Sequence, residues 1–444
     1  MTIVYVAALL GLYSILMLRW PRTGTALLIA ITLLWPAYIV LVWLSGPGIN
    51  PQRLMIPVAI MVWSFHLLAI PAYRGQLVSI VGANRDIFLM IAAFFILGIF
   101  SGFLSPFDKG QAVRGSLNQI MLIPMLMVLV LTYFNKPASI HKLLILFVGI
   151  ALVVQILGAV EWVRQEVLFR EFVDPSSEFA ENVLEGKIRL DKHRVTSVFD
   201  NPLSYAQFLV FMAPLIMFYR RKRVHPIWRS LAWFQLGVIP ISVWSTGSRT
   251  GIVLILLSYF WGFVLWLRRC RMSKGLRTLA VSTLIASAGF AAAIVFLRLG
   301  TEGLLGGNES LEASTAARVY QLALGIPAIA ESPIYGFGVH QGTNFLGGLT
   351  SIDNYYLTTV LEKGVVGLGL LLGVQIAVIW RLHRSSKYRS SGGLASLTEL
   401  LMVAFVTLYL FEFTLSVVEV FSVTYIVLAC FLLLNRIDEH SKLS

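Results

Sequence analysis

Charged residues are scarce in this sequence, and their scarcity excludes a soluble globular protein. Only 13% of the 444 residues are Asp, Glu, Lys or Arg, whereas 57% are hydrophobic and the mean hydropathy is +0.80. Soluble domains carry about 25% charged residues. Apolar runs at 24–44, 143–160, 251–267 and 364–380 are near or above the length that crosses a bilayer as a helix. The sequence therefore predicts an all-α, polytopic helical membrane protein, with about 12–13 transmembrane helices in one integral membrane domain.

Cysteine is also scarce, and several motifs of metal and nucleotide chemistry are missing. The two cysteines, Cys270 and Cys430, cannot form a disulfide framework, and neither belongs to a zinc-site spacing. The long polar loops contain no Asp-x-Asp, histidine cluster, P-loop or nucleophile elbow. We therefore expect no metal and no cofactor, with arginine supplying the positive charge that Mg²⁺ supplies elsewhere.

The basic residues that are present lie mostly in alternate loops. The formal net charge is +13, but this distribution does not indicate a nucleic-acid partner. If every apolar run crosses once, the Lys- and Arg-rich loops share one side, which the positive-inside rule makes cytoplasmic. The loops at 161–202 and 300–354 then lie outside, residues 436–444 lie inside, and the lipid bilayer is a predicted partner. Arg53 and Arg114 are exceptions, each in a short outer loop.

The first long outer loop, residues 161–202, mixes acidic and basic residues. Glu178, Glu181 and Glu185 recur at helical spacing, and nearby basic residues balance their charge. We interpret them as the solvated face of a helix. Arg194 lies near the end of the loop, just before the next apolar run.

The second long outer loop, residues 300–354, begins with a glycine-rich tip and continues into a short helix. Either Ser310 or Ser314 is a suitable N-cap for a helix through roughly residues 317–330. This helix carries Arg318, and we expect it to lie at the membrane interface without spanning the bilayer.

Polar and glycine-rich residues continue along this loop. Arg318 and Gln321 share one face of the loop helix at helical spacing. The following residues, 331–338, contain Gly336 and Gly338. Glycine permits the positive φ angles that other residues resist, so this stretch predicts tight turns.

Three arginines stand out on the outer side. Arg249 lies in the turn TGSRTG at residues 246–251, Arg318 lies on the loop helix, and Arg194 ends the first long loop. Arginine presents a planar fork of donors that suits phosphate oxygens and stays charged at any relevant pH. Several arginines converging at the outer surface would form a diphosphate clamp. The alternative is that each one is an interfacial anchor that reaches toward lipid headgroups.

Asp353 is the candidate general base among the outer carboxylates. A carboxylate at the start of a spanning helix is commonly only a cap, and Asp353 and Asn354 both precede the apolar run that begins at Tyr355. Asn354, Tyr355 and Tyr356 favour a substrate-binding site, although aromatic side chains at this depth are also typical of the interfacial belt. Both interpretations stay open.

Glu362 and Lys363 form an unusual charged pair in the same apolar run. Charged residues within a membrane segment are costly and usually functional. The pair therefore either lines a cavity, with Glu362 contacting substrate, or forms a structural polar notch in the bundle. His340 is an alternative base or substrate-binding residue in the outer loop, although a lone loop histidine is commonly only solvated.

Four short motifs follow one another in the C-terminal half of the sequence. They are GSRTG at 247–251, AR at 317–318, SPxxGxG at 332–338, and DN at 353–354 followed after nine residues by GxxG at 364–367. This order, together with a layout of many helices and one major outer loop, resembles the O-antigen ligase and O-antigen polymerase superfamily of bacterial membrane glycosyltransferases. The similarity covers mainly residues 194–369.

The resemblance implies a GT-C-like enzyme of the bacterial inner membrane. Such an enzyme takes glycan from an undecaprenyl-diphosphate carrier on the periplasmic face, so the loops at 161–202 and 300–354 would be periplasmic. The family's functional arginines match Arg249 and Arg318, which would be ligands of the carrier diphosphate. Arg194 is a candidate third ligand for phosphate or sugar.

Asp353 bears on which activity within the superfamily to expect. Ligases of the family usually carry histidine at this place, and here Asp353 replaces it. A carboxylate can also accept the proton of an acceptor hydroxyl while arginines stabilise the departing diphosphate. We therefore expect a metal-independent, inverting polymerase that joins lipid-linked oligosaccharide repeat units into exopolysaccharide or O-antigen. The alternative is a ligase that transfers glycan to lipid A-core or another acceptor.

The expected partners follow from the same resemblance. They are an undecaprenyl-diphosphate-linked oligosaccharide donor and a glycan acceptor, and a chain-length regulator protein is a further candidate. A non-catalytic glycolipid transporter remains a second alternative. Transporters tend to show internal repeats and broken helices near the bilayer midplane. The sequence shows no convincing repeat, and the candidate residues gather at one face, which favours an enzyme.

Overall fold

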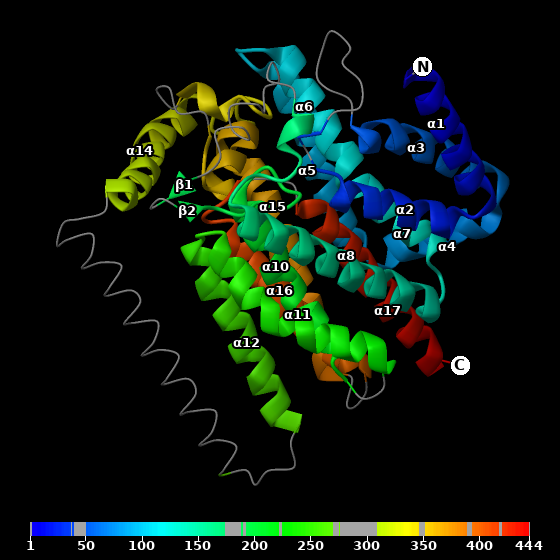
Figure 1. Cartoon of the computed structure of the whole chain (residues 1–444). Coiled ribbons are helices and arrows are strands. Elements are labelled where there is room, and N and C mark those ends of the chain that lie inside the picture. Colours follow the sequence, from blue (N-terminus) through cyan, green and yellow to red (C-terminus); the bar gives the residue numbers. More distant parts are fainter. Residues whose placement is uncertain are drawn as a thin grey trace.

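The structure is a computed structural model, and it is built almost entirely of helices, as the apolar runs predict (Figure 1). The predictions for Glu178, Glu181 and Glu185, for Cys270 and for the glycine-rich tip at 300–308 lie outside the described residues. The structure describes residues 2–36, 38–39, 50–173, 188–189, 192–221, 224–269, 275, 309–345, 351–388, 393–416 and 420–443.

Proline marks the start of many helices. It stands at the first position of α2, α3, α4, α7, α8, α10 and α11, where its missing N–H leaves no hydrogen bond unmade. The helices of the N-terminal half are α1 Thr2–Arg19, α2 Pro21–Leu34, α3 Pro51–Ala69, α4 Pro71–Ala83, α5 Arg85–Leu104, α6 Lys109–Leu122, α7 Pro124–Tyr133, α8 Pro137–Arg164 and the 3-10 turn η1 Arg170–Phe172. Those that follow are α10 Pro202–Tyr219, α11 Pro226–Ser245, α12 Arg249–Arg269, α14 Glu309–Glu331, η2 Gly342–Phe345, α15 Tyr355–Tyr388, α16 Gly393–Phe411 and α17 Phe421–Leu443.

Seven spans in the described part of the chain are long and apolar enough to cross a membrane. Four shorter apolar helices accompany them: Ala7–Arg19, Pro21–Leu34, Ala395–Phe411 and Phe421–Arg436. The prediction of a polytopic helical membrane protein is therefore confirmed. The number of helices in the whole chain stays a prediction, since residues 276–308 lie outside the described part.

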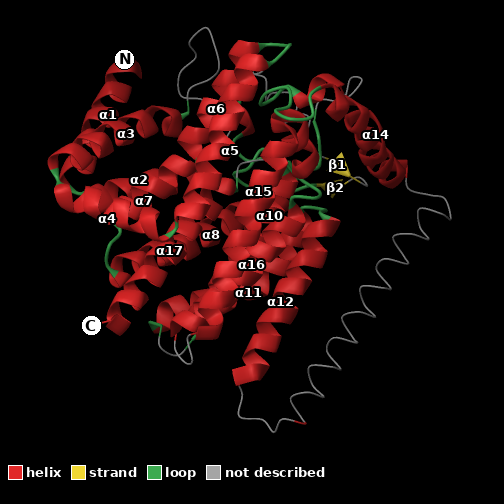
Figure 2. Cartoon of the chain, turned by 180° about the vertical axis from the view of Figure 1, so that it is seen from behind, coloured by secondary structure: helices red, strands yellow, loops and turns green. Residues whose placement is uncertain are grey.

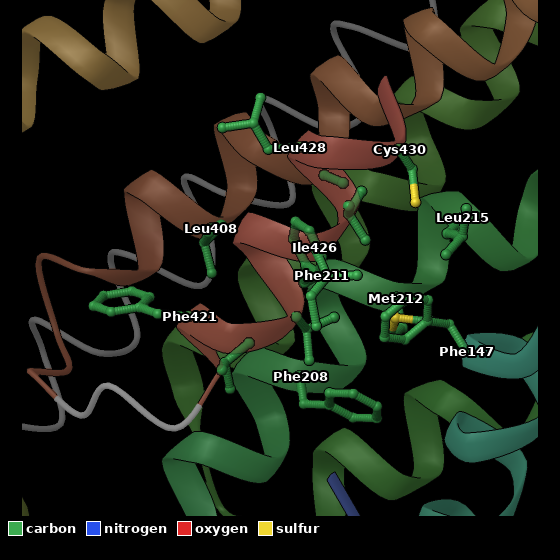
Figure 3. Packing of buried hydrophobic residues seen from close by; sticks show 14 of the residues in the cluster. Phe147, Phe208, Phe211, Met212, Leu215, Leu408, Phe421, Ile426, Leu428 and Cys430 are labelled. Carbon is green, nitrogen blue, oxygen red and sulfur yellow. The ribbon is translucent and has the colours of Figure 1, made fainter. Parts of the chain in front are cut away.

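Helix α10 forms the centre of the bundle and is buried on all sides. It packs against α16, α11 and α12. Figure 3 shows Phe208, Phe211 and Met212 of α10 packed in one cluster with Phe147 of α8 and Ile426 of α17. A helix with apolar residues on every face, as α10 is, belongs inside a bundle and not at its surface.

Helix α15 is broken at Gly364, which has φ +67° and ψ −174°. Tyr356 Oη lies 3.1 Å from Gln375 Oε1, although nineteen positions separate the two residues. A straight helix would place them about 28 Å apart. The part of α15 before the break therefore turns back toward the part after it.

Helix α14 is longer than the predicted helix at 317–330. Because it begins at Glu309, Ser310 and Ser314 lie inside it, and the prediction that one of them is its N-cap is wrong. α14 lies at the edge of the molecule, beside the only strands among the described residues (Figures 1 and 2). These strands, β1 Ile188–Arg189 and β2 Lys192–His193, form a short antiparallel hairpin.

The candidate residues and the basic loops lie at opposite ends of the bundle. Arg249 begins α12, whereas Arg268 and Arg269 end it. Asp353 precedes α15, whereas Arg381 near its other end contacts Asp86 at the start of α5. This arrangement agrees with the loop alternation from which we predicted the outer side.

Candidate functional site

Helix α14 brings Arg318 next to Asp353. Arg318 Nε lies 3.6 Å from Asp353 Oδ2, so the predicted diphosphate ligand and the predicted base form an ion pair. Their side chains are 39% and 33% exposed, which leaves both accessible to a ligand. Arg318 Nε itself is buried and has no hydrogen-bond partner among the described residues. The exposed parts of the two side chains keep donor and acceptor capacity for further groups.

Gln321 holds the backbone that carries Asp353. It lies one turn after Arg318 on the same face of α14, as predicted, and its side chain is 4% exposed. Its Oε1 accepts a hydrogen bond of 3.0 Å from Asp353 N, and its Nε2 donates one of 3.0 Å to Ser351 O. The amide of Gln321 thus fixes the loop just before α15. Its role could not be assigned from sequence, because the two partners lie about thirty positions away along the chain.

Asn354, and not Asp353, caps α15. Asn354 Oδ1 accepts hydrogen bonds from Tyr356 N at 2.9 Å and Leu357 N at 3.1 Å. This geometry is that of an N-cap side chain. The carboxylate of Asp353 is consequently left for Arg318, so the interpretation of Asp353 as a simple cap is wrong. Tyr355 is buried, and its ring packs against that of Phe421 with 4.8 Å between centroids.

Arg249 occupies the first position of α12, directly after a tight turn. Gly247 adopts φ +63°, and Ser248 Oγ accepts a hydrogen bond from Gly251 N, which caps the helix. The free N–H groups of a helix start favour anions. A guanidinium at this position adds a charged fork to the same place. The turn TGSRTG thus places Arg249 at the start of α12, a position that is compatible with the predicted arginine clamp.

Arg194 packs on the same turn. Its Nε donates a hydrogen bond of 2.7 Å to Thr246 O, and it lies 3.3 Å from the point where a side chain on Gly247 would begin. A larger residue than glycine would therefore press on the guanidinium. The structure brings Arg194 and the Arg249 turn together, as the predicted clamp requires.

A buried hydrogen-bonded pair, Glu161 and His193, supports the loop that carries Arg194. Glu161, at the end of α8, is fully buried, and its Oε1 lies 2.8 Å from His193 Nε2. The same carboxylate accepts hydrogen bonds from Thr196 N at 3.0 Å and Ser197 N at 2.6 Å. Sequence reasoning did not single out Glu161. A carboxylate at the end of a long apolar run, near a histidine in the next loop, is the signal that could have found it.

The loop at 333–340 fills the break in α15. Phe337 N donates to Leu361 O at 2.8 Å, Gly338 N donates to Glu362 O at 2.9 Å, and Val365 N donates to Pro333 O at 2.7 Å. The backbone groups freed by the break therefore find partners. Glycine at 336 and 338 has φ of +68° and +96°, which confirms the predicted tight turns.

Glu362 and Lys363 are buried beside this joint. Glu362 Oε1 accepts a hydrogen bond of 2.7 Å from His340 N. Lys363 Nζ donates to Gln119 Oε1 at 3.2 Å and lies 3.7 Å from the centre of the Phe94 ring, a cation–π contact. These partners favour the structural polar notch over the cavity. The imidazole of His340 is exposed, and its ring lies against Gly115.

The predicted residues thus form two groups and a supporting joint. Arg318 and Asp353 make one group, Arg194 and Arg249 make the other, and both lie at the same end of the bundle. Among the described residues, no cluster of three or more His, Cys, Asp or Glu side chains could hold a metal ion.

The comparison with known families adds independent support. Residues 234–372 match the model of a protein family described as O-antigen ligase. The matched segment contains α12, α14 and the start of α15, and with them Arg249, Arg318 and Asp353. No curated protein matches the chain. Residues 234–372 are therefore similar to O-antigen ligases, which is consistent with the O-antigen ligase and polymerase superfamily that the motifs of the chain resemble.

Proposed function

We propose that the protein is a polymerase that joins undecaprenyl-diphosphate-linked oligosaccharide repeat units on the periplasmic face of the bacterial inner membrane. The O-antigen ligase domain supports a membrane enzyme of glycan transfer in general. The observation that carries the proposed transfer chemistry is the partly exposed ion pair of Arg318 and Asp353. Glycan transfer from a diphosphate needs a cation for the phosphate and an acceptor for the proton, and we propose these two side chains for the two roles. Asp353 in place of the histidine usual in ligases favours a polymerase within the superfamily.

In the proposed reaction, an acceptor sugar hydroxyl attacks the anomeric carbon of the donor glycan. A new C–O glycosidic bond forms, and the bond from the anomeric carbon to the diphosphate oxygen breaks with inversion. The hydroxyl proton moves to the carboxylate of Asp353. The leaving undecaprenyl diphosphate keeps the electron pair of the broken bond, and Arg318 stabilises its charge.

Arg249 is the second proposed ligand of the diphosphate. It begins α12, where the helix start and the guanidinium both favour an anion. Arg194, held on the same turn through Thr246 O, is proposed to bind phosphate or the first sugar. In this scheme the arginines supply the charge stabilisation, and we propose that no metal takes part.

Two alternatives remain to be compared with the polymerase. A ligase would use the same arginines and the same base with a different acceptor, and the acceptor therefore has to be identified by experiment. A transporter is favoured by one observation, the broken helix α15. The partners found by Phe337 N, Gly338 N and Val365 N at that break favour a packed joint over a transport path.

The experiment measures extension of a lipid-linked oligosaccharide by purified protein without added metal or nucleotide. We expect Arg318→Ala to slow extension by about 100- to 1,000-fold, the usual cost of losing a transition-state donor. Asp353→Asn should slow it by about 100- to 10,000-fold. Arg114→Ala is the matched control, because Arg114 is predicted to lie on the outer side and its Nε bonds the backbone of its own helix at Gly110 O.

A second variant separates a base from a residue that only orients Arg318. If Asp353 accepts the proton, Asp353→Glu should retain part of the extension rate, whereas Asp353→Asn should not, because an amide accepts no proton from the hydroxyl. Full-length polymer from both Arg318→Ala and Asp353→Asn at normal protein levels would exclude this mechanism. Transfer to lipid A-core without any extension would show a ligase instead.

A further inference from the structure

A carboxyl group that takes no part in the proposed reaction lies buried behind Tyr355. Glu412 follows the last residue of α16, and it is 2% exposed. A small cavity of about 30 Å³ adjoins it, between α15, α16 and α17. Its lining consists of Tyr355, Leu371, Val374, Gln375, Phe405, Tyr409, Glu412, Phe421, Thr424, Tyr425 and Leu428.

The hydrogen bonds at Glu412 suit an ionised carboxylate. Gln375 Nε2 donates to Glu412 Oε2 at 2.6 Å. The other end of the same amide, Gln375 Oε1, already accepts from Tyr356 Oη at 3.1 Å and so is engaged. The amide is therefore oriented with its donor toward Glu412, which a charged carboxylate requires.

Among the described residues, no positive side chain lines this cavity. The lining residues include no Lys, Arg or His. An uncompensated charge inside a membrane protein is costly. The groups that face Glu412 from the three helices are instead neutral: tyrosine rings and hydroxyls at 355, 356, 409 and 425, the hydroxyl of Thr424 and the amide of Gln375.

The cavity restricts what could supply the missing charge. A space of about 10–15 Å³ holds one water molecule, so this cavity admits one or two particles of that size and excludes a sugar or a lipid group. Divalent cations in proteins usually bind several carboxylates, and here the lining offers one. Hydroxyl oxygens and aromatic faces are suitable neighbours for a single positive charge.

We propose that this cavity is a binding site for a monovalent inorganic cation, such as Na⁺ or K⁺, held by the carboxylate of Glu412. The cation competes with a proton for the same oxygen atoms. Without a cation, burial raises the pKa of the Glu412 carboxyl to about 8, so the group is protonated below that pH. Cation binding then releases the proton, as metal binding does at other acidic ligands.

The test measures thermal unfolding of the purified full chain in NaCl, KCl and choline chloride at equal ionic strength. Choline is the control because it is too large for the cavity. Above the pKa of Glu412 we expect Tm to rise with Na⁺ or K⁺ by about 2 °C for each tenfold increase in concentration, and not with choline. At mildly acidic pH the rise should shrink, because the proton then occupies the site.

Two variants complete the test. Glu412→Gln keeps the volume and removes the charge, so its Tm should not respond to the cation. Asp86→Asn removes a carboxylate at the opposite end of the bundle and should respond like the wild type. If Glu412→Gln does not fold, Thr424→Val should weaken the response instead. The proposal is overturned by a wild-type Tm that is the same in all three salts, or by an equal response in Glu412→Gln. Neither result depends on the proposed polymerase reaction.

Discussion

Gln321→Leu should abolish most activity without unfolding the protein, because Gln321 holds Asp353 in place. The substitution keeps the side-chain volume and removes two hydrogen bonds of 3.0 Å, to Asp353 N and to Ser351 O. The N–H of Asp353 is then left without its partner in a half-buried position, whereas Ser351 is exposed and its carbonyl can bond water. Losing both hydrogen bonds should lower the free energy that keeps this loop ordered by about 2–3 kcal/mol in total.

The loss of free energy should destabilise the loop before α15 and leave the stability of the helix bundle largely unchanged. At 1.4 kcal/mol for each factor of ten, it lowers the equilibrium constant between the ordered and the disordered loop by roughly 30- to 150-fold. If turnover needs Asp353 beside Arg318, extension of the lipid-linked oligosaccharide should slow by up to the same factor. Hydrogen exchange at the Asp353 amide should accelerate correspondingly.

Gln341→Leu is the matched control for this experiment. Gln341 is another buried glutamine of the same loop region, and its side chain bonds Gln111 Oε1 at 3.2 Å. Among the described residues its side chain bonds Gln111 and Asn344 and not the residues at 351–353, so its loss should affect stability but not extension. Normal extension by Gln321→Leu, or equal losses in both variants, would refute the assignment of Gln321 as the residue that positions Asp353.

Two further predictions concern the supporting structure and are measured by thermal unfolding. Gly364→Ala should destabilise the protein by several kcal/mol, because the new Cβ would lie 2.1 Å from Ile334 O. The φ of +67° alone costs a non-glycine residue about 1–2 kcal/mol. Gly369→Ala is the control in the same helix: it has open space and should be neutral or stabilising, so equal Tm values for the two variants would contradict this account. Glu161→Ala should lower the free energy of unfolding by about 3–5 kcal/mol. It should lower Tm more than His193→Ala does, because the Glu161 carboxylate also accepts backbone hydrogen bonds, and the reverse order of Tm values would contradict this role of Glu161.

Composition and local motifs were sufficient to predict the fold class and several parts of the site. The apolar runs gave the helices, since a bilayer leaves few other ways to pair the backbone. Gly336 and Gly338 gave tight turns because their φ angles are a local property. The shared face of Arg318 and Gln321 followed from helical spacing alone.

The local sequence could not distinguish the roles of Asp353 and Asn354. Both residue types are suitable N-caps, and both precede the same helix. Only the structure shows that Asn354 bonds the helix start, which leaves Asp353 to Arg318. The distinction rests on a partner that lies more than thirty positions away, and helix propensity carries no information about it.

The supporting contacts were missed for the same reason. Glu161 and His193 pair across 32 positions, and Lys363 reaches Gln119 across 244. Charged residues in apolar runs indicated that partners must exist, because an unpaired charge there is too costly. Their identity depends on which helices are neighbours, and this follows from packing of the whole bundle.

The break in α15 explains why two separate glycine motifs belong to one element. A Cβ on Gly336 would lie 2.5 Å from Glu362 C, and one on Gly364 would lie 2.1 Å from Ile334 O. The motifs SPxxGxG and GxxG are thus the two halves of one joint in which backbone meets backbone. By turning the first part of α15 back, this joint brings Asp353 to the level of the outer end of α16, where Tyr355 N bonds Glu412 O at 2.9 Å. The glycines therefore serve the geometry of the joint, which positions Asp353 for the role that we propose.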